Sequence, residues 1–274
     1  MTFSLINTFQ ICIITSKSKS MKKRYFLVPM LLLSVISSCV NVEERYVFQK
    51  NGSCKINYTF NMGKAVSVLS NLLPDSVRQS PSYLMPKDTA VNFLNGLTDS
   101  ARAKIKGEQV DVARSTMLHI KMNLKNNQML ATVQYDARSP KEVKYFLTHI
   151  SKLAQKQQLG ELLNNQQVLS TASSRGIVIS QDYFNYDIGS KHFSRKVDTV
   201  KFRKYFKQNE AMFNMAKAAL LDMPYNVTMH FPRPVKKTGN SRAKLSPDKK
   251  QLTLNSNFED IVKSPQIMNL KVEY

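Results

Sequence analysis

Polar and apolar residues alternate strictly in two segments of the chain. In residues 54–62 every second side chain is apolar or amphipathic, and the Asn51-Gly52 pair before them favours a hairpin turn, with residues 45–50 as the partner strand. Residues 118–124 and 129–135 alternate in the same way. A period of two residues is typical of a strand that buries one face. The pattern therefore predicts two antiparallel hairpins.

A second pattern, with apolar residues three and four positions apart, predicts amphipathic helices. It is clearest in residues 139–154, where Ser139-Pro140-Lys141-Glu142 forms a capping box with proline at the first helical position. Thr199 is positioned to cap a long helix that reaches about residue 221. Further helices are expected at residues 65–73, 88–105 and 258–263.

The second half of the chain predicts further strands, at residues 177–186, 191–197, 227–231, 251–256 and 267–274. Hairpins and helices come in blocks, without a regular alternation of strand and helix, and this favours an α+β fold. We expect antiparallel β-sheet built from hairpins, with amphipathic helices packed on one face. The domain spans residues 45–274, and the Gln-, Asn- and Ser-rich residues 157–176 are a candidate boundary between two subdomains.

The start of the chain has the pattern of a secretory leader. Residues 25–36 form a short apolar run, preceded by Met21 and three cations. Such a run is too short to span a membrane, which takes about 20 residues, but it suits a signal peptide. We interpret residues 1–20 as an upstream extension and 21–38 as the signal peptide. The other apolar run, residues 5–14, is also too short to span.

The apolar run ends in Ile36-Ser37-Ser38-Cys39. This ending resembles the lipobox of bacterial lipoproteins, in which an aliphatic residue and two small residues precede a cysteine that receives a diacylglyceryl group. The resemblance implies cleavage before Cys39, lipidation of its thiol, and a tether at residues 39–44. Two or more acyl chains hold a protein stably on a membrane without a transmembrane helix. The alternative is an ordinary signal peptide with an incidental cysteine.

The mature chain would be strongly basic. Removing five leader cations from 40 leaves 35 Lys and Arg against 19 Asp and Glu, a net charge of +16. Such a charge favours nucleic acid, an anionic membrane or acidic partner proteins. Export argues against nucleic acid, so the other two classes remain. Cys54 is then the one unmodified cysteine, which excludes an internal disulfide and predicts a buried structural thiol.

Catalytic and metal-binding signatures are missing from the sequence. It contains none of the common nucleophile, nucleotide-binding or zinc-protease motifs, and its four histidines, at positions 119, 149, 192 and 230, are far apart. We therefore expect no enzyme activity, no cofactor and no metal site. His119 and His230 alternate with apolar neighbours and are expected on solvated strand faces.

Cations cluster in two segments of the chain. The first follows Lys191, Arg195 and Lys196, and the second occupies the last hairpins. Either they form a solvated basic face, or they contact anionic lipid or glycolipid near the anchor. The candidate contact residues are Lys201, Arg203, Lys204, Lys207, Lys236, Lys237, Lys249 and Lys250.

Residues 225–258 resemble the end of an LppM-type lipoprotein domain, in which a strand leads into a proline-marked turn, an Asn or Gly loop and a last hairpin. Phe231-Pro232, Gly239-Asn240 and residues 252–254 occupy those places. The whole chain is also similar to the basic envelope lipoproteins common in Bacteroidetes. These resemblances imply an outer-membrane lipoprotein with an antiparallel α+β domain that contacts lipid, and they bring no catalytic residues.

Together these observations predict a lipid-anchored protein of the cell envelope with a binding or scaffold role. Its expected partners are the membrane, anionic lipid or glycolipid, and acidic envelope proteins. Two alternatives stay open: a lipid-binding or transfer module, which needs a deep apolar cavity, and an unrecognised periplasmic hydrolase, which needs a cleft that gathers histidines and acids.

Overall fold

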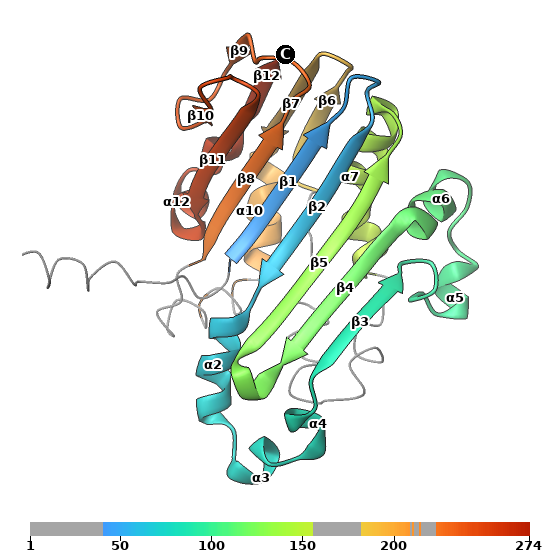
Figure 1. Ribbon diagram of the computed structural model, residues 1–274, viewed down its shortest axis with the longest axis vertical. Helices are drawn as coiled ribbons and strands as arrows, with labels where there is room; N and C mark the ends of the chain where they lie inside the picture. The colour runs from blue at the N-terminus through green and yellow to red at the C-terminus, as the bar shows by residue number, and fades with distance from the viewer. Residues whose placement is uncertain (1–40, 156–181, 209, 211–213, 215–222) are drawn as a thin grey trace, which may run out of the picture. The chain divides into compact units, whose positions relative to one another are not determined.

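The two predicted hairpins form the centre of an eight-stranded sheet (Figure 1). The first hairpin is β1 (Asn41–Phe48) with β2 (Cys54–Asn61), and the second is β4 (Thr116–Asn123) with β5 (Gln128–Ala137). β2 pairs antiparallel with β5 and so joins the hairpins. Both hairpin predictions are confirmed. The first turn is longer than expected, because the backbone closes between Gln49 and Ser53 and Gly52 adopts a φ of 85°.

We describe a computed structural model over residues 41–155, 182–208, 210, 214 and 223–274. The described residues belong to one unit. The leader and Cys39 lie outside the described residues, as do the predicted subdomain boundary at 157–176 and the start of the strand predicted at 177–186.

The remaining strands of this sheet extend both of its edges. On one side β8 (Pro224–His230) pairs with β1 in parallel, and β11 (Gln251–Asn257) and β10 (Lys244–Leu245) follow it. On the other side β3 (Lys87–Asn92) pairs with β4. The order is β10-β11-β8-β1-β2-β5-β4-β3. The parallel β1–β8 pair departs from the expectation of an antiparallel sheet. The two strands begin at Asn41 and Pro224, far apart in the sequence, so no hairpin turn connects them.

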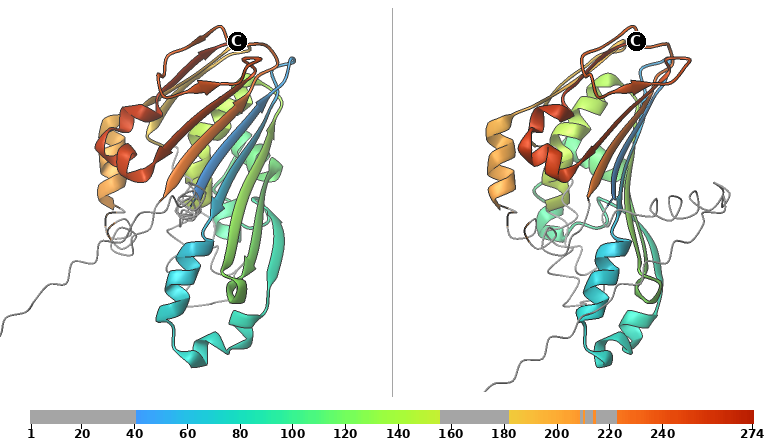
Figure 2. Two further views of the ribbon diagram at one scale, coloured as in Figure 1. Left: turned by 60° about the vertical axis from the view of Figure 1, so that its left-hand side comes forward. Right: turned by 90° about the vertical axis from the view of Figure 1, so that its left-hand side faces the viewer.

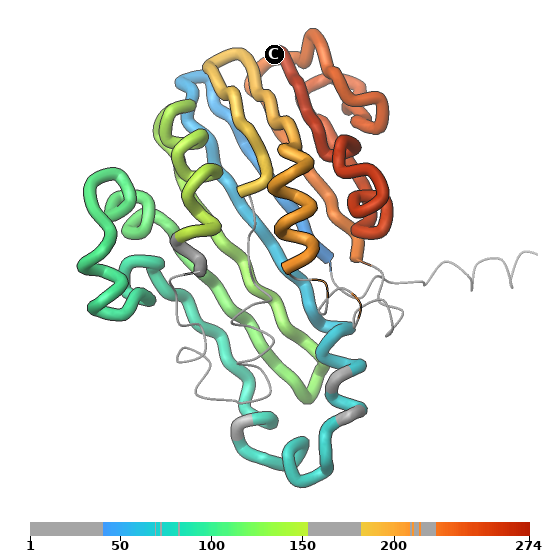
Figure 3. Tube along the Cα trace, turned by 180° about the vertical axis from the view of Figure 1, so that it is seen from behind, coloured from blue at the N-terminus to red at the C-terminus, as the bar shows by residue number. Residues whose placement is uncertain are grey.

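A second, four-stranded sheet lies on one face of the first (Figure 2). Its order is β6 (Phe184–Ile188), β7 (His192–Val197), β12 (Leu270–Glu273) and β9 (Lys237–Thr238). Helices share this face: Figure 3 shows α7 (Pro140–Gln155), α10 (Thr199–Gln208) and α12 (Phe258–Lys263) on the same side of the large sheet. The predicted α+β class, with helices on one face, is confirmed.

Shorter helices connect the strands. α2 (Gly63–Leu72) matches a prediction, whereas the helix expected at 88–105 is wrong, because β3 and a turn occupy its first half. The predicted tether at 39–44 is also too long, since β1 already begins at Asn41. The other elements are α3 (Asp75–Arg78), α4 (Pro81–Leu84), α5 (Asp99–Arg102), α6 (Glu108–Ser115), η1 (Leu124–Asn126) and η2 (Pro265–Met268).

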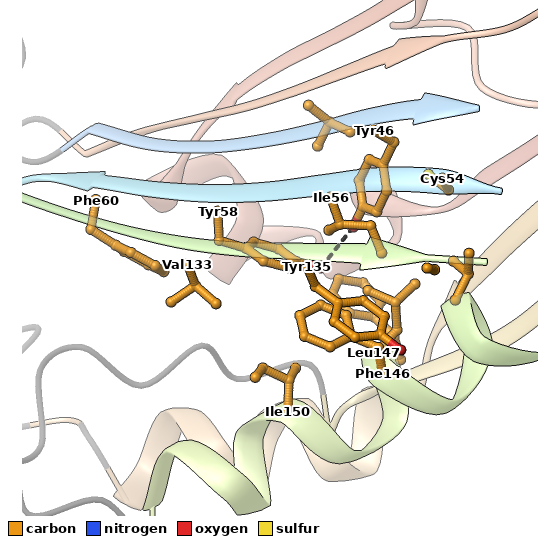
Figure 4. Close-up of a cluster of buried hydrophobic side chains, with 14 of the residues drawn as sticks. Tyr46, Cys54, Ile56, Tyr58, Phe60, Val133, Tyr135, Phe146, Leu147 and Ile150 are labelled. Carbon is orange, nitrogen blue, oxygen red and sulfur yellow. Dashed lines mark hydrogen bonds between the residues drawn. The ribbon is translucent and has the colours of Figure 1, made fainter. Parts of the chain in front are cut away.

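The core lies between the large sheet and the layer of α7 and the second sheet. Alternate residues of β2 and β5 point into it, and α7 adds Phe146, Leu147 and Ile150, all fully buried (Figure 4). The rings of Tyr135 and Phe146 stack with their centroids 4.3 Å apart. Fully burying one such side chain stabilises the fold by about 1.5–3 kcal/mol. The opposite face of the large sheet is polar, as strict alternation predicts.

Candidate functional site

The second predicted cation cluster is gathered at one edge of the molecule. β10 is the last strand of the large sheet and β9 is the last strand of the small sheet. The segments that flank them meet, because the Val235 N–H, just before β9, donates to the Lys249 carbonyl, after β10, at 2.8 Å. We call residues 236–250 the β9–β10 edge. It brings together four predicted contact residues, all exposed: Lys236, Lys237, Lys249 and Lys250.

The turn between β10 and β11 presents the last two of these lysines. The Asp248 carboxylate accepts hydrogen bonds from the Ser246 hydroxyl and from the Lys250 N–H, and these bonds lower its pKa. Lys249 adopts a positive φ of 55° in this turn. The carboxylate is thus engaged with its own turn. None of the ion pairs recorded for the described residues involves Lys249 or Lys250.

The first predicted cluster lies on α10, where all four predicted cations are exposed: Lys201, Arg203, Lys204 and Lys207. Asp198, and not the expected Thr199, caps this helix, since its carboxylate accepts the Val200 and Lys201 N–H groups at 3.1 Å each. These bonds, first that from Lys201, lower the pKa of Asp198.

The inner face of α10 fixes where these cations lie. Phe202 is buried, and the Phe206 ring lies 6.3 Å from that of Phe258, at the start of α12. The Phe258 N–H donates to the Met223 carbonyl, next to the first residue of β8. Because β8 and β1 run in parallel register, the last turn of α10 lies at the end of the sheet where β1 begins.

Arg195 does not belong to either cluster, although the sequence places it among surface cations. Its guanidinium forms an ion pair with Glu44 at 2.6 Å, and both side chains are completely buried. Arg195 Nε also donates to the Met268 carbonyl at 3.2 Å, and the guanidinium lies 4.5 Å from the centre of the Phe184 ring. Glu44 was expected in the tether. The pair instead joins β1 of the large sheet to β7 of the small one.

Tyrosine hydroxyls complete this buried network. Tyr46 donates to Glu44 at 2.9 Å, Tyr46 and Tyr58 share a hydrogen bond of 2.8 Å, and Tyr225 donates to the other Glu44 oxygen. Burial, followed by the Glu44 charge, raises the pKa of Tyr46 well above its usual value. The hydroxyls therefore stay protonated and act as donors. Glu44 and Arg195 are fully buried, so a ligand in solution does not reach them. We therefore interpret the network as a structural connection between the two sheets.

A polar groove lies between α6, the end of β5 and the start of α7. Its volume is about 200 Å³, below the ~300–1,000 Å³ of common ligand sites. Ion pairs between Lys141 and Glu108, at 2.8 Å, and between Arg138 and Glu142, at 3.1 Å, line it. Burial raises the pKa of Tyr135, in its wall, to about 12. The charged groups in this groove largely pair with one another.

The four histidines lie on different elements. His119 is exposed on β4, His149 stacks on Tyr145 with centroids 4.1 Å apart, His192 lies 3.4 Å from Asp187, and His230 is partly buried on β8. Burial and Arg45 lower the pKa of His230. Within the described ranges, no three His, Cys, Asp or Glu side chains gather in a way that could hold a metal ion.

Cys54 is buried, as predicted, at the start of β2. Burial raises the pKa of its thiol to about 12, which makes it a poor nucleophile at neutral pH. None of the helices in the described part of the chain is long and apolar enough to cross a membrane.

Comparisons with known proteins add little to this geometry. No protein-family model matches the chain, and no curated protein matches it in sequence. Among solved structures it is similar to the NMR structure of the folded domain of the Mycobacterium tuberculosis LppM protein, with 7% identity, a TM-score of 0.31, and coverage of 86% of this chain and 91% of that one. These values are too low to support an argument from that protein to this chain.

Proposed function

We propose that this chain is a lipid-anchored protein of the cell envelope, held at the outer membrane by Cys39, which works by binding and not by catalysis. The observation that carries this proposal is the leader: a basic start at residues 21–24, a short apolar run at 25–36, and Ile36-Ser37-Ser38-Cys39, in the order and spacing of a lipoprotein signal. The domain begins directly behind it, since β1 starts at Asn41.

The basic residues support a binding role at a membrane. The mature chain has a net charge of +16, and both predicted cation clusters are exposed. Each basic residue close to an anionic membrane surface contributes about 1 kcal/mol to attraction. We therefore assign to these clusters contact with anionic lipid or glycolipid headgroups, with acidic envelope proteins as further partners.

Three variants of the full chain test the anchor. Wild type, Cys39→Ser and the matched control Cys12→Ser, each expressed in a bacterium that processes lipoproteins, are separated into membrane and soluble fractions. We expect the wild type and Cys12→Ser in the membrane fraction, with acyl chains on an amino-terminal Cys39 by mass spectrometry. Cys39→Ser should lose the acyl chains and shift toward the soluble fraction. An unmodified Cys39, or an amino terminus generated elsewhere, would refute the proposal.

A further inference from the structure

The spacing between the anchor and the sheet limits where the membrane can lie. Cys39 precedes the first residue of β1 by two positions, and two extended residues span at most about 7 Å. Strands lie about 4.8 Å apart, so the β10 edge, three strands away, lies about 14 Å to the side of β1. Four strands place the β3 edge about 19 Å away. The β10 edge is therefore the nearer one, but its lysines lie at the far end of the strands, because Gln251, next to Lys250, pairs with His230, which pairs with Val47 near the end of β1. The anchor and these lysines can both meet a membrane only if the membrane runs along the strands on that side.

The domain cannot stand upright on this anchor. Figure 1 shows that α2, α3 and α4 extend the domain beyond the point where β1 begins. The contacts agree, because α2 starts directly after β2, whose last residue Asn61 pairs with Asn41. A membrane perpendicular to the strands at Asn41 would run through these helices. The membrane must therefore lie along a side of the domain.

Charge distinguishes the sides of the domain. On the outer face of the large sheet near β1, the cations Arg45 and Lys55 are balanced by the acids Glu43 and Asp136, with neutral polar residues such as Asn57 between them. The β9–β10 edge holds six Lys and Arg against one Asp, a net charge of +5. Figure 2, right, shows β10, β11, α12, α10 and α2 on the side that carries this edge.

We propose that the domain lies along the membrane on its β9–β10 edge, with the lysines of that edge among anionic lipid headgroups. This inference rests on the lipid anchor of the proposed function and adds an orientation to it. The same cations have a second effect on the sheet. β10 has only two residues, and lysines beside this edge strand discourage pairing with a strand of another chain.

A fluorescent probe can report which edge meets the bilayer. The full chain, purified with its lipid, is reconstituted into vesicles of phosphatidylcholine and phosphatidylglycerol that contain a nitroxide-labelled lipid as quencher. Single cysteines for a maleimide dye replace Ser241, exposed on the β9–β10 edge, or Ala90, exposed on the β3 edge. The background carries Cys12→Ser, and Cys54 is protected from the dye because its side chain is buried.

We expect quenching several-fold stronger at position 241 than at position 90. One-molar salt should reduce this difference, because the Debye length then falls to about 3 Å. Lys249→Glu combined with Lys250→Glu should also reduce it, because these substitutions reverse charges on the edge. Equal quenching at the two positions, or stronger quenching at position 90, would overturn the orientation. Failure of the anchor gives a different result. If Cys39 carries no lipid, its thiol is free, and a parent chain without an added cysteine is then labelled by the dye at Cys39.

Discussion

The two edges of the large sheet carry different charge and different structure. The β9–β10 edge has a net charge of +5, whereas the longer segment 75–115, around the β3 edge, holds six cations and five acids, a net charge of +1. The cations near β3 include Arg78, Arg102 and Arg114, each in an ion pair with a nearby acid. The net charge of the whole chain is therefore a poor guide to where it binds.

Apolar residues show the opposite distribution. Of the three large apolar side chains that are exposed among the described residues, Leu84 and Met85 lie on the β3 side, directly before β3. The third, Val200, lies in the first turn of α10. The β9–β10 edge, in contrast, exposes lysines and no large apolar side chain within its described residues. Its attraction to a membrane is therefore expected to depend on salt.

The largest effect should come from the buried Glu44–Arg195 pair, because it connects the two sheets to which β9 and β10 belong. Glu44→Ala leaves the Arg195 charge buried without its partner, and we expect it to lower the free energy of unfolding by about 3–5 kcal/mol. Urea denaturation followed by circular dichroism measures this. The exposed Arg138–Glu142 pair supplies the control, because Arg138→Ala should cost about 0–1 kcal/mol.

A double variant separates the charge from the packing. Glu44→Leu combined with Arg195→Met replaces the pair by apolar side chains and should recover most of the stability lost in Glu44→Ala. If Glu44→Ala costs no more than Arg138→Ala, the pair does not lock the sheets.

Charge reversal compares the two edges directly. In the full chain carrying Cys39→Ser, replacement of Lys236, Lys237, Lys249 and Lys250 by Glu should weaken binding to anionic vesicles by several kcal/mol, since each basic residue contributes about 1 kcal/mol. The matched control reverses four exposed lysines on the β3 side, Lys104, Lys106, Lys121 and Lys125, and should change binding much less. Co-sedimentation at low and high salt measures both. Equal losses would show that only the total charge matters.

The α10 cations should have an intermediate effect. Lys201 lies 3.6 Å from Asp198, so part of its charge is already balanced, and the helix lies at the corner where β1 begins. Reversal of Lys204 and Lys207 should weaken vesicle binding less than reversal of Lys249 and Lys250 in the same co-sedimentation assay. A larger loss from the α10 pair would move the membrane contact to that helix.

The smallest effect is the pH dependence of α10. The pKa of Asp198 lies below its ordinary 3.8 in the folded chain, chiefly because the Lys201 N–H binds the carboxylate. Its contribution to stability is therefore complete above 3.8 and is lost as the pH falls through the folded pKa. Hydrogen exchange should show α10 losing protection over that range. Asp198→Asn keeps a capping oxygen and should remove this dependence; an unchanged profile in that variant would contradict the assignment.

Local patterns made much of the fold predictable. The strands of both hairpins follow from a period of two, and α7 follows from its capping box and apolar stripe, because these signals lie within a few residues. The parallel pairing of β1 with β8 could not be predicted, since it joins Val42 to Tyr225 and depends on the packing of the whole domain. The helix expected at 88–105 failed for the same reason: tertiary pairing with β4 overrode local propensity.

The buried ion pair was missed because charged residues are almost always exposed. A signal was nevertheless present. Glu44 precedes Tyr46 and Phe48 at intervals of two, and Arg195 stands between Phe193 and Val197 at the same interval. Both therefore occupy the buried face of a strand. The two surface clusters, in contrast, were predicted residue by residue, but their positions relative to the anchor depend on the strand order, which the sequence does not contain.

Lysine reactivity in the anchored chain tests the central claim, that the lipid anchor holds the basic edge against the membrane. The full chain in anionic vesicles and its Cys39→Ser form in solution are acetylated with a membrane-impermeant reagent, and each lysine is quantified by mass spectrometry. We expect anchoring to slow acetylation of Lys249 and Lys250 several-fold while Lys104 and Lys106, on the β3 side, react equally in both forms. Protection of Lys104 and Lys106, or equal reactivity of all four lysines, would contradict the account.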